Sequence, residues 1–309
     1  MTSTLTSLQG TILIYLFCGF LLKKTNLMNS ASDNFLSNLL TGFLLPINVF
    51  VSFIKSFTFD GLAACISILG LGILFEGSIF LFTKVRFKSF SDKQMAVARY
   101  DMLVSNGGLI GTPIIENLFG AGGVLYANVF LIPQRIMIYS AGESIFNPKA
   151  KKNFQQIIKS IYTNKVIIAM LLGFILIAFN ISLPEFAFNA LHNIGKCLSP
   201  MSLMLVGSML AQKLEISNQH IKNLTKIVMF RQIIFPLVVI LVVTPLPFDF
   251  MTKAIMVLLI GMPVGATAAV YANKYGGDAQ FASMSVFVST LSATITLIGL
   301  MAAMEFLWL

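Results

Sequence analysis

The chain has 309 residues, of which 57% are hydrophobic and only 11% are charged, whereas soluble domains contain roughly 25% charged residues. This composition, with a mean hydropathy of +0.86, excludes a soluble globular protein or a soluble domain on a single membrane anchor. The formal net charge of +9 would suggest nucleic-acid binding in a soluble chain. Here the basic residues form short clusters between apolar runs, which is typical of membrane topology. We therefore expect membrane lipids around most of the chain and no nucleic-acid partner.

The chain's three cysteines, Cys18, Cys65 and Cys197, lie far apart in the sequence. None belongs to a CxxC motif or has a histidine at metal-ligand spacing, so we expect no disulfide framework, no metal site and no cofactor. The first charged residue is Lys23, so the N-terminus lacks the basic region of a signal peptide. We expect it to be retained as the first membrane span.

A helix needs about 20 mostly apolar residues to cross a bilayer, and ten segments of the chain meet this requirement. Charged or turn residues bound each of them. These ten segments lie near 5–22, 34–55, 61–83, 95–118, 122–146, 160–181, 186–211, 221–245, 251–273 and 279–305. The sequence therefore predicts an all-α polytopic membrane protein with ten transmembrane helices.

Basic residues predict the orientation of these spans, because cytoplasmic loops and span ends retain Lys and Arg. On one side of the membrane the prediction places only Lys55, Lys196 and Lys253. The other side has seventeen: Lys23, Lys24, Lys84, Arg86, Lys88, Lys93, Arg99, Lys149, Lys151, Lys152, Lys159, Lys165, Lys213, Lys222, Lys226, Arg231 and Lys274. We expect this second side to be cytoplasmic, with both termini outside the cell membrane.

Prolines at matching positions indicate an internal repeat. Pro46 and Pro200 in spans 2 and 7 are 154 residues apart, and Pro113 and Pro263 in spans 4 and 9 are 150 residues apart. The repeats are expected at 1–146 and 160–309, joined by a cytoplasmic loop at 147–159. Because each half has an odd number of spans, the second enters the membrane in the opposite sense, and the repeat is inverted.

Spans 4 and 9 are predicted to be broken near the middle of the membrane. A lone membrane proline is most simply a kink, but these two prolines have flexible and polar neighbours, at 105–112 and 261–267. Such a break is tolerated only inside protein or along a cavity. The two breaks are expected to cross, with half-helix N-termini facing a central site. Helix N-termini favour negative charge, so this site is expected to bind an anion such as a carboxylate.

These same residues resemble a known family. The resemblance is carried by the run from Asn106 to Pro113, by Gly120, by Pro263 with Ala266, Ala268 and Ala269, and by Ser289 to Ser292. Together they resemble the auxin efflux carrier family, which includes bacterial malate permease-like carriers and is similar in fold to bile acid sodium symporters. The resemblance covers essentially all ten spans.

The resemblance implies secondary active transport of small organic anions by an elevator-type movement, with malate-like dicarboxylates or auxin-like acids as substrates. A scaffold of spans 1, 2, 6 and 7 would hold a transport domain of spans 3–5 and 8–10. A homodimer would form through the scaffold spans. The substrate would lie at the crossover, lined by Asn106, Gly108, Thr112, Pro113, Met262 and Pro263. The chain lacks the long central loop of plant auxin exporters, which argues against auxin itself.

Two ionisable residues inside predicted spans are further candidates, because such residues are costly in a membrane. Arg135 lies near the middle of span 5, and Glu76 lies deep in span 3. Arg135 is either a structural residue bonded to backbone carbonyls, a counter-charge for the anion, or a partner of Glu76. An unpaired Glu76 could carry a coupled proton, whereas pairing with Arg135 would keep it charged. The sequence leaves proton and sodium open as coupling ions.

Neutral polar residues of spans 5 and 10 complete the predicted site: Asn128, Gln134, Ser289 and Thr290. Small hydroxyls in membrane helices more often serve close packing or bond their own backbone, so packing is the alternative interpretation. The spans contain no HExxH motif, no GxSxG motif and no pair of aspartates, which argues against an intramembrane enzyme. A channel or a membrane sensor on the same fold remains the other alternative.

Overall fold

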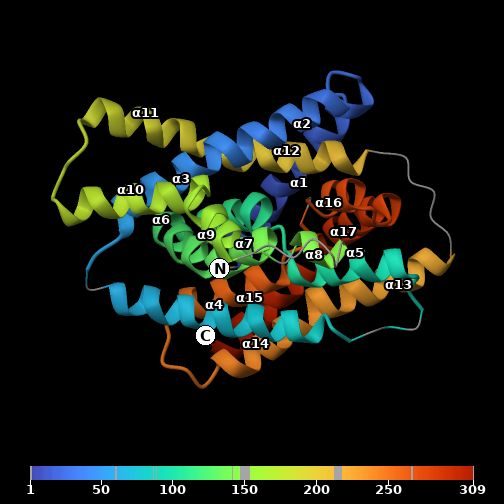
Figure 1. Cartoon of the computed structure of the whole chain (residues 1–309). Helices are drawn as coiled ribbons and strands as arrows, with labels where there is room; N and C mark the ends of the chain where they lie inside the picture. Colours follow the sequence, from blue (N-terminus) through green and yellow to red (C-terminus); the bar gives the residue numbers. More distant parts are fainter. Residues whose placement is uncertain are drawn as a thin grey trace. The chain divides into compact units, whose positions relative to one another are not determined.

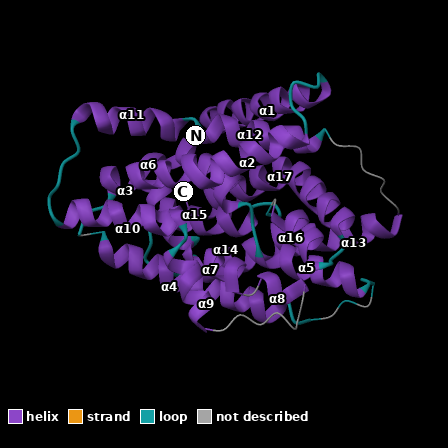
Figure 2. Cartoon of the chain, turned by 45° about the horizontal axis from the view of Figure 1, so that its top comes forward, coloured by secondary structure: helices purple, strands orange, loops and turns teal. Residues whose placement is uncertain are grey.

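The computed structural model describes residues 2–308 apart from 60, 86, 88, 141, 147–153, 212–217 and 266. Regular structure in this part of the chain is helical, as Figure 2 shows, except for one isolated β-bridge between Ser105 and Val264. The prediction of an all-α protein is confirmed. The predicted loop lies partly outside the described residues, and residues 154–159 belong to helix α9 (Phe154–Tyr162).

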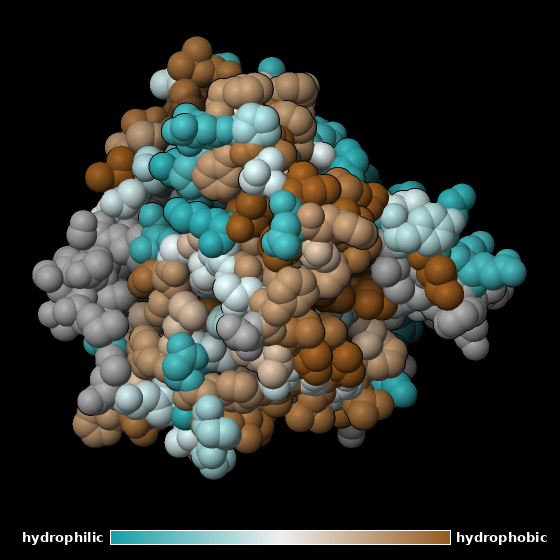
Figure 3. Space-filling model, turned by 90° about the vertical axis from the view of Figure 1, so that its left-hand side faces the viewer, coloured by the Kyte–Doolittle hydropathy of each residue, from teal (hydrophilic) through white to brown (hydrophobic). Residues whose placement is uncertain are grey.

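Several described helices are suited to a membrane by length and composition. Five are long and apolar enough to cross one: Ala31–Ser56, Leu62–Phe82, Gly107–Phe130, Gln219–Val243 and Ala279–Trp308. Two shorter apolar helices are Lys165–Ala178 and Phe250–Gly261. Large apolar side chains on several helices are exposed, among them Ile14, Phe17, Ile66, Ile73, Leu241 and Ile295, and Figure 3 shows apolar surface over much of one face. The chain is a multi-pass membrane protein; the inverted ten-span repeat stays a prediction.

The chain divides into two compact units, each drawn from both halves of the sequence. The first unit comprises Met1–Thr58, Gly108–Leu125 and Lys165–Leu214. The second comprises Phe59–Gly107, Tyr126–Asn164 and Glu215–Leu309. The division falls between Gly107 and Gly108, inside the run of residues that carries the family resemblance.

Within the described residues, the first unit is built from six α-helices and the first part of a seventh. The six are α1 (Thr2–Lys24), α2 (Ser30–Leu39), α3 (Leu45–Ser56), α10 (Lys165–Ala178), α11 (Glu185–Lys196) and α12 (Leu198–Leu210). Helix α6 (Thr112–Phe130) begins here and is interrupted at Gly120, whose φ of 65° is a conformation that glycine adopts at little cost. Helix α1 packs on α12, and α3 packs on both α10 and α11 (Figure 1).

The second unit contains the remaining helices. They are α4 (Leu62–Phe82), α5 (Asp92–Leu103), α7 (Ile132–Ser140), α8 (Gly142–Phe146), α9, α13 (Asn218–Val228), α14 (Phe235–Val243), α15 (Phe250–Gly261), α16 (Thr267–Tyr275) and α17 (Ala279–Trp308). Side chains cap the N-termini of α5 and α15. The Ser91 hydroxyl accepts the Gln94 N–H at 3.3 Å, and the Asp249 carboxylate accepts the Thr252 N–H at 3.2 Å, which fixes the starts of α5 and α15.

Short π-helical turns precede three of the prolines. They span Leu40–Leu44 before Pro46, Gly107–Gly111 before Pro113, and Met229–Ile234 before Pro236. A proline ring removes one helix hydrogen bond and clashes with the carbonyl one turn earlier, and the wider turn makes room for it. The helices of spans 2 and 8 therefore continue past their prolines. In spans 4 and 9 the helix is interrupted, at Val104 and at Met262.

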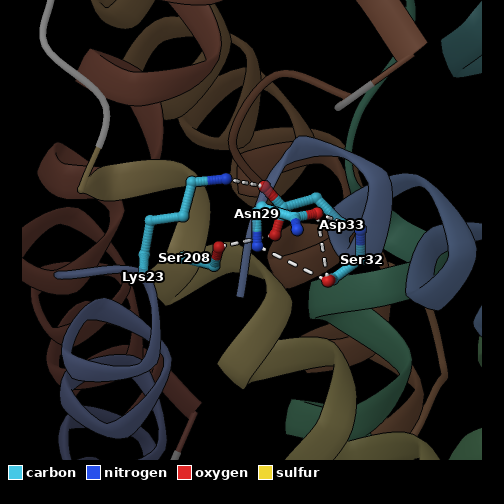
Figure 4. A network of polar contacts seen from close by, with 5 residues as sticks. All are labelled: Lys23, Asn29, Ser32, Asp33 and Ser208. Carbon is cyan, nitrogen blue, oxygen red and sulfur yellow. Dashed lines mark hydrogen bonds and ion pairs between the residues drawn. The ribbon is translucent and has the colours of Figure 1, made fainter. Parts of the chain in front are cut away.

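A polar network ties three helices of the first unit together (Figure 4). The buried Asp33 carboxylate pairs with the Lys23 ammonium at the end of α1 and accepts a 2.6 Å hydrogen bond from the Ser208 hydroxyl of α12. Asn29 caps α2 by accepting the Ser32 N–H at 2.9 Å. The network holds the turn between α1 and α2 against α12.

Helices α1 and α12 approach each other through two glycines. A methyl group on Gly19 would overlap the backbone carbonyl of Met204, and one on Gly207 would overlap the backbone carbonyl of Leu16. Small residues allow membrane helices to pack backbone against backbone in this way. Each helix contributes one glycine that lies against the backbone of the other helix, so both glycines are needed for the observed separation of the helices.

We expect Gly207→Ala to destabilise the first unit by about 1–3 kcal/mol, the usual effect of overpacking, because the backbone of α1 would have to move away. Thermal unfolding in detergent measures the effect. Gly299→Ala in α17 is the matched control, because no atom lies within 4 Å of the added methyl group there. Equal unfolding temperatures for the two variants would contradict the close packing of α1 on α12.

Candidate functional site at the paired helix breaks

The ends of α5 and α15 lie side by side in the second unit, and their backbones pair. The residues that follow each helix, Val104 and Met262, are extended, with ψ of 108° and 149°. The Asn106 N–H donates to the Pro263 carbonyl at 2.8 Å, and the Gly265 N–H donates to the Val104 carbonyl at 2.9 Å. Two helix breaks that are far apart in sequence therefore form a short antiparallel pair.

Polar side chains satisfy other backbone groups of this paired segment. Ser289 of α17 accepts the Val264 N–H on its hydroxyl at 3.1 Å. Gln134 of α7 donates to the Ser105 carbonyl at 2.9 Å and accepts from the Ser105 hydroxyl at 2.7 Å. Backbone groups outside a helix need such partners in a membrane. The segment thus has the protein-buried setting that a broken span requires.

Glycine allows the two strands of the pair to approach closely. A methyl group on Gly265 would lie 2.9 Å from a side-chain carbon of Val104 and 3.3 Å from its carbonyl oxygen. On the other strand, a methyl group on Gly107 would lie 2.7 Å from a side-chain carbon of Leu131. The glycines around the two prolines thus serve packing as well as flexibility.

Arg231 holds both broken helices together. Its Nη1 donates to the Met102 carbonyl in the last turn of α5 at 2.9 Å, and its Nε donates to the Met262 carbonyl at 3.3 Å. The C-terminus of a helix has a partial negative charge, which a cation stabilises. Counting basic residues placed Arg231 with those of the cytoplasmic side, but the structure shows it fully buried. A signal was present, because Arg231 and Gln232 interrupt an apolar run shortly before Pro236.

Two buried carboxylates share the charge of Arg231. Glu76 of α4 and Asp101 of α5 both interact electrostatically with its guanidinium. Within the described residues, Oε2 of Glu76 and Nη2 of Arg231 have no hydrogen-bond partner, and the polar side chain described as acting on the Asp101 carboxylate is that of Ser285. Asp101, like Arg231, is fully buried in the structure. The three residues form a charged cluster next to the paired breaks.

Comparison with known families gives the coarse function. A family profile described as "Membrane transport protein" matches residues 5–301, which is nearly the whole chain. The chain belongs to this family. The match confirms the resemblance to the auxin efflux carriers, and comparison with curated proteins finds no match. The protein is therefore a membrane transport protein, and its family is one of transporters.

The structure of this membrane transport protein places five of the twelve predicted site residues at the paired breaks. The paired segment contains Met262 and Pro263. The side chains that bond to it are those of Ser289 and Gln134. The side-chain amide of Asn106 has no hydrogen-bond partner in the described part of the chain, although its backbone is paired. The hydroxyl of Thr290, on α17, likewise has none there. Asn106 itself is only 5% exposed.

The remaining predicted residues are not part of the paired segment. Gly108, Thr112 and Pro113 belong to the first unit of the membrane transport protein, where Thr112 is fully buried. Arg135 donates to Asn128, at 3.0 Å to its backbone carbonyl and at 2.7 Å to its side-chain oxygen. Asn128 and Arg135 therefore bond to each other. Among the described residues, the positive charge that acts on Glu76 is that of Arg231.

Sequence reasoning missed Gln232, which links α17 to the helix that carries Arg231. Its Nε2 donates to the Ser289 carbonyl at 2.5 Å, and its Oε1 accepts from the Ser292 hydroxyl at 2.7 Å and the Thr296 hydroxyl at 3.2 Å. Gln232 is fully buried. Ser289 thus connects two parts of the membrane transport protein's site, because its hydroxyl bonds to the break and its carbonyl bonds to Gln232.

Proposed function

We propose that this membrane transport protein is a secondary active transporter of small organic anions, with carboxylates such as malate-like dicarboxylates or auxin-like acids as substrates. The observation that supports this most is the pair of broken helices in the second unit, with the free Asn106 amide on one strand and Arg231 bonded to both helix ends. An amide N–H donates to a carboxylate, and such charge-assisted hydrogen bonds are strong.

The charge distribution around the breaks also favours this substrate class. Helix α16 begins at Thr267, four residues after Pro263, so the positive end of its dipole lies just beyond the break. Arg231 contributes a guanidinium nitrogen that is unpartnered in the described residues, while Glu76 and Asp101 share its positive charge. An organic anion bound here would complete hydrogen bonds that the protein alone leaves open.

An elevator-type movement is the mechanism we propose, in which spans 3–5 and 8–10 carry the substrate against a scaffold of spans 1, 2, 6 and 7. The division of the chain into two compact units supports it in part, because α1–α3 and α10–α12 form one unit and most other helices form the second, whereas residues 108–125 of predicted spans 4 and 5 belong to the first unit. The packing of α1 on α12 and of α10 on α3 also supports an inverted repeat, because the repeat would exchange these two pairs. The scaffold is the proposed homodimer interface.

Thermal stability of the purified protein tests the substrate class. A ligand that binds only the folded state raises apparent stability by RT ln(1 + [L]/Kd). We expect selected carboxylates to raise the unfolding temperature of the wild-type protein and not that of Asn106→Ala. The screen includes matched organic cations and is run with and without sodium at two pH values. Stabilisation by the cations alone would contradict the proposal.

Glu76 is the proposed coupling residue, with a proton or sodium as its ion. We expect Glu76→Gln to remove the response of transport to a pH gradient while substrate exchange is partly retained, because exchange requires the moving site but no net change in protonation. Uptake into proteoliposomes with and without an imposed gradient measures both. Glu185→Gln, an exposed position at the start of α11, is the control. If the Glu76 variant still concentrates substrate in response to the pH gradient, the coupling ion binds elsewhere.

The proposed orientation in the plasma membrane has both termini outside and the 147–159 segment in the cytoplasm. We expect a single cysteine at position 3 to react with an impermeant reagent on intact cells, and one at position 151 to react only after permeabilisation. The native cysteines must be replaced first, because Cys197 is exposed. Labelling of position 151 from outside intact cells would overturn this orientation.

A further inference from the structure

The first unit contains a carboxylate–amide pair formed by Glu116 and Asn48. Glu116 lies on α6, one turn after Pro113, and Asn48 lies on α3 next to Pro46. The Asn48 Nδ2 donates to Oε2 of Glu116 at 3.1 Å and to Oε1 at 3.3 Å. It also lies 3.4 Å from the carbonyl of Gly195 in α11. One amide group therefore joins three helices.

The other end of the Asn48 amide is unsatisfied. Asn48 is only 4% exposed, and within the described residues its Oδ1 has no hydrogen-bond partner. A buried acceptor without a partner is unfavourable, and an ionised carboxylate cannot provide one because it has no proton to donate. A carboxylic acid could, since its O–H can donate to the amide oxygen while its other oxygen accepts from the amide N–H.

We propose that Glu116 and Asn48 form a proton-binding site within the first unit. A proton taken up by the Glu116 carboxylate forms a neutral carboxylic acid, which a rotation of the carboxyl group aligns with the Asn48 amide. The two side chains then share two hydrogen bonds, one from the acid O–H to Oδ1 and one from Nδ2 to the remaining carboxyl oxygen. Protonation thereby satisfies the buried oxygen that the ionised state leaves without a partner.

The surroundings hold this pair in place and supply its electrostatic balance. The backbone of Asn48 packs against Gly195, where an added methyl group would lie 3.2 Å from the Asn48 Cα. On the next residue of α6, the Asn117 amide donates to the Ser199 hydroxyl of α12 at 3.3 Å. The charged groups described as acting on Glu116 are Lys196 of α11 and Lys55 of α3. Both lysines favour the ionised form of Glu116. Burial and the unpartnered Asn48 oxygen favour its protonated form.

This site goes beyond the proposed function, because it involves neither the paired breaks nor the identity of the transported anion. Infrared difference spectroscopy of the full-length protein between pH 8 and pH 5, about the range over which perturbed carboxyl groups titrate, tests it directly. We expect a protonated-carboxyl C=O band that appears on acidification and is absent in Glu116→Gln. In Asn48→Ala the band should move to higher frequency, because the acid loses its hydrogen-bond partner.

Glu185→Gln is the matched control and should leave this band unchanged. Isotopic labelling of glutamate carboxyl carbons in the wild-type protein shows whether the band belongs to a glutamate, and the spectrum of Glu76→Gln, in which the Glu116 band should persist, distinguishes it from a band of Glu76. The proposal is overturned if the wild-type and Glu116→Gln difference spectra are the same, or if no glutamate label shifts the band. Failure of every carboxylate in the ligand screen would leave this result unaffected, so the two proposals fail separately.

Discussion

Replacing Arg231 with methionine is expected to abolish transport and to destabilise the protein by about 3–5 kcal/mol, the usual result of removing one partner of a buried charge pair. The variant would leave Glu76 and Asp101 buried without their described cation. It would also free the carbonyls of Met102 and Met262 at the two helix ends. Thermal unfolding in detergent and uptake by proteoliposomes measure the two effects.

A second substitution separates charge from packing. Adding Asp101→Asn to Arg231→Met should restore part of the lost stability, because it removes one of the uncompensated buried charges, but it should not restore transport. Lys222→Met is the control, because Lys222 is exposed on α13 of the same predicted span. An Arg231→Met protein with wild-type stability and transport would show that the cluster is not part of the site.

Asn106→Ala is expected to weaken anion binding by about 10- to 100-fold, the loss of one hydrogen bond to a charged group, and to reduce transport accordingly. The substitution leaves the Asn106 N–H paired with the Pro263 carbonyl, so it removes the ligand-binding amide and not the break. Pro263→Ala is expected to abolish transport by a different route, because alanine allows α15 to continue into the paired segment.

Expression level, membrane insertion and uptake of malate-like substrates measure these effects. Asn193→Ala is the matched control, since Asn193 is an exposed asparagine of α11. Both site variants should insert like the control. Wild-type transport in Asn106→Ala and in Pro263→Ala would remove the paired breaks from the mechanism.

The helical architecture and the two breaks could be predicted because their signals are local. A run of apolar residues predicts a helix, and a proline among glycines and polar residues indicates where the backbone leaves it. The extended residues at Val104 and Met262 lie beside the predicted Asn106 and Pro263. Backbone preferences are properties of a few neighbouring residues, so one sequence contains the necessary information.

The charged cluster could not be predicted, because it depends on which side chains face the interior. Arg231 was counted with the basic residues of the cytoplasmic side, and Asp101 lies near the start of predicted span 4, where a charged residue most simply faces the cytoplasm. The structure buries both, because the two broken helices end beside them and supply carbonyl groups for Arg231. Glu116 was overlooked for a related reason, since its amide partner is 68 residues away in the sequence.

Counterflow in reconstituted vesicles tests the central claim most directly. Vesicles are loaded with unlabelled malate or another carboxylate that stabilises the protein, and are diluted into a trace of the same labelled anion. An alternating-access carrier predicts transient, saturable accumulation of label above equilibrium, which Arg231→Met and Asn106→Ala should lose. Label that only equilibrates, without saturation or overshoot, in vesicles containing active wild-type protein would indicate a channel and would contradict the account.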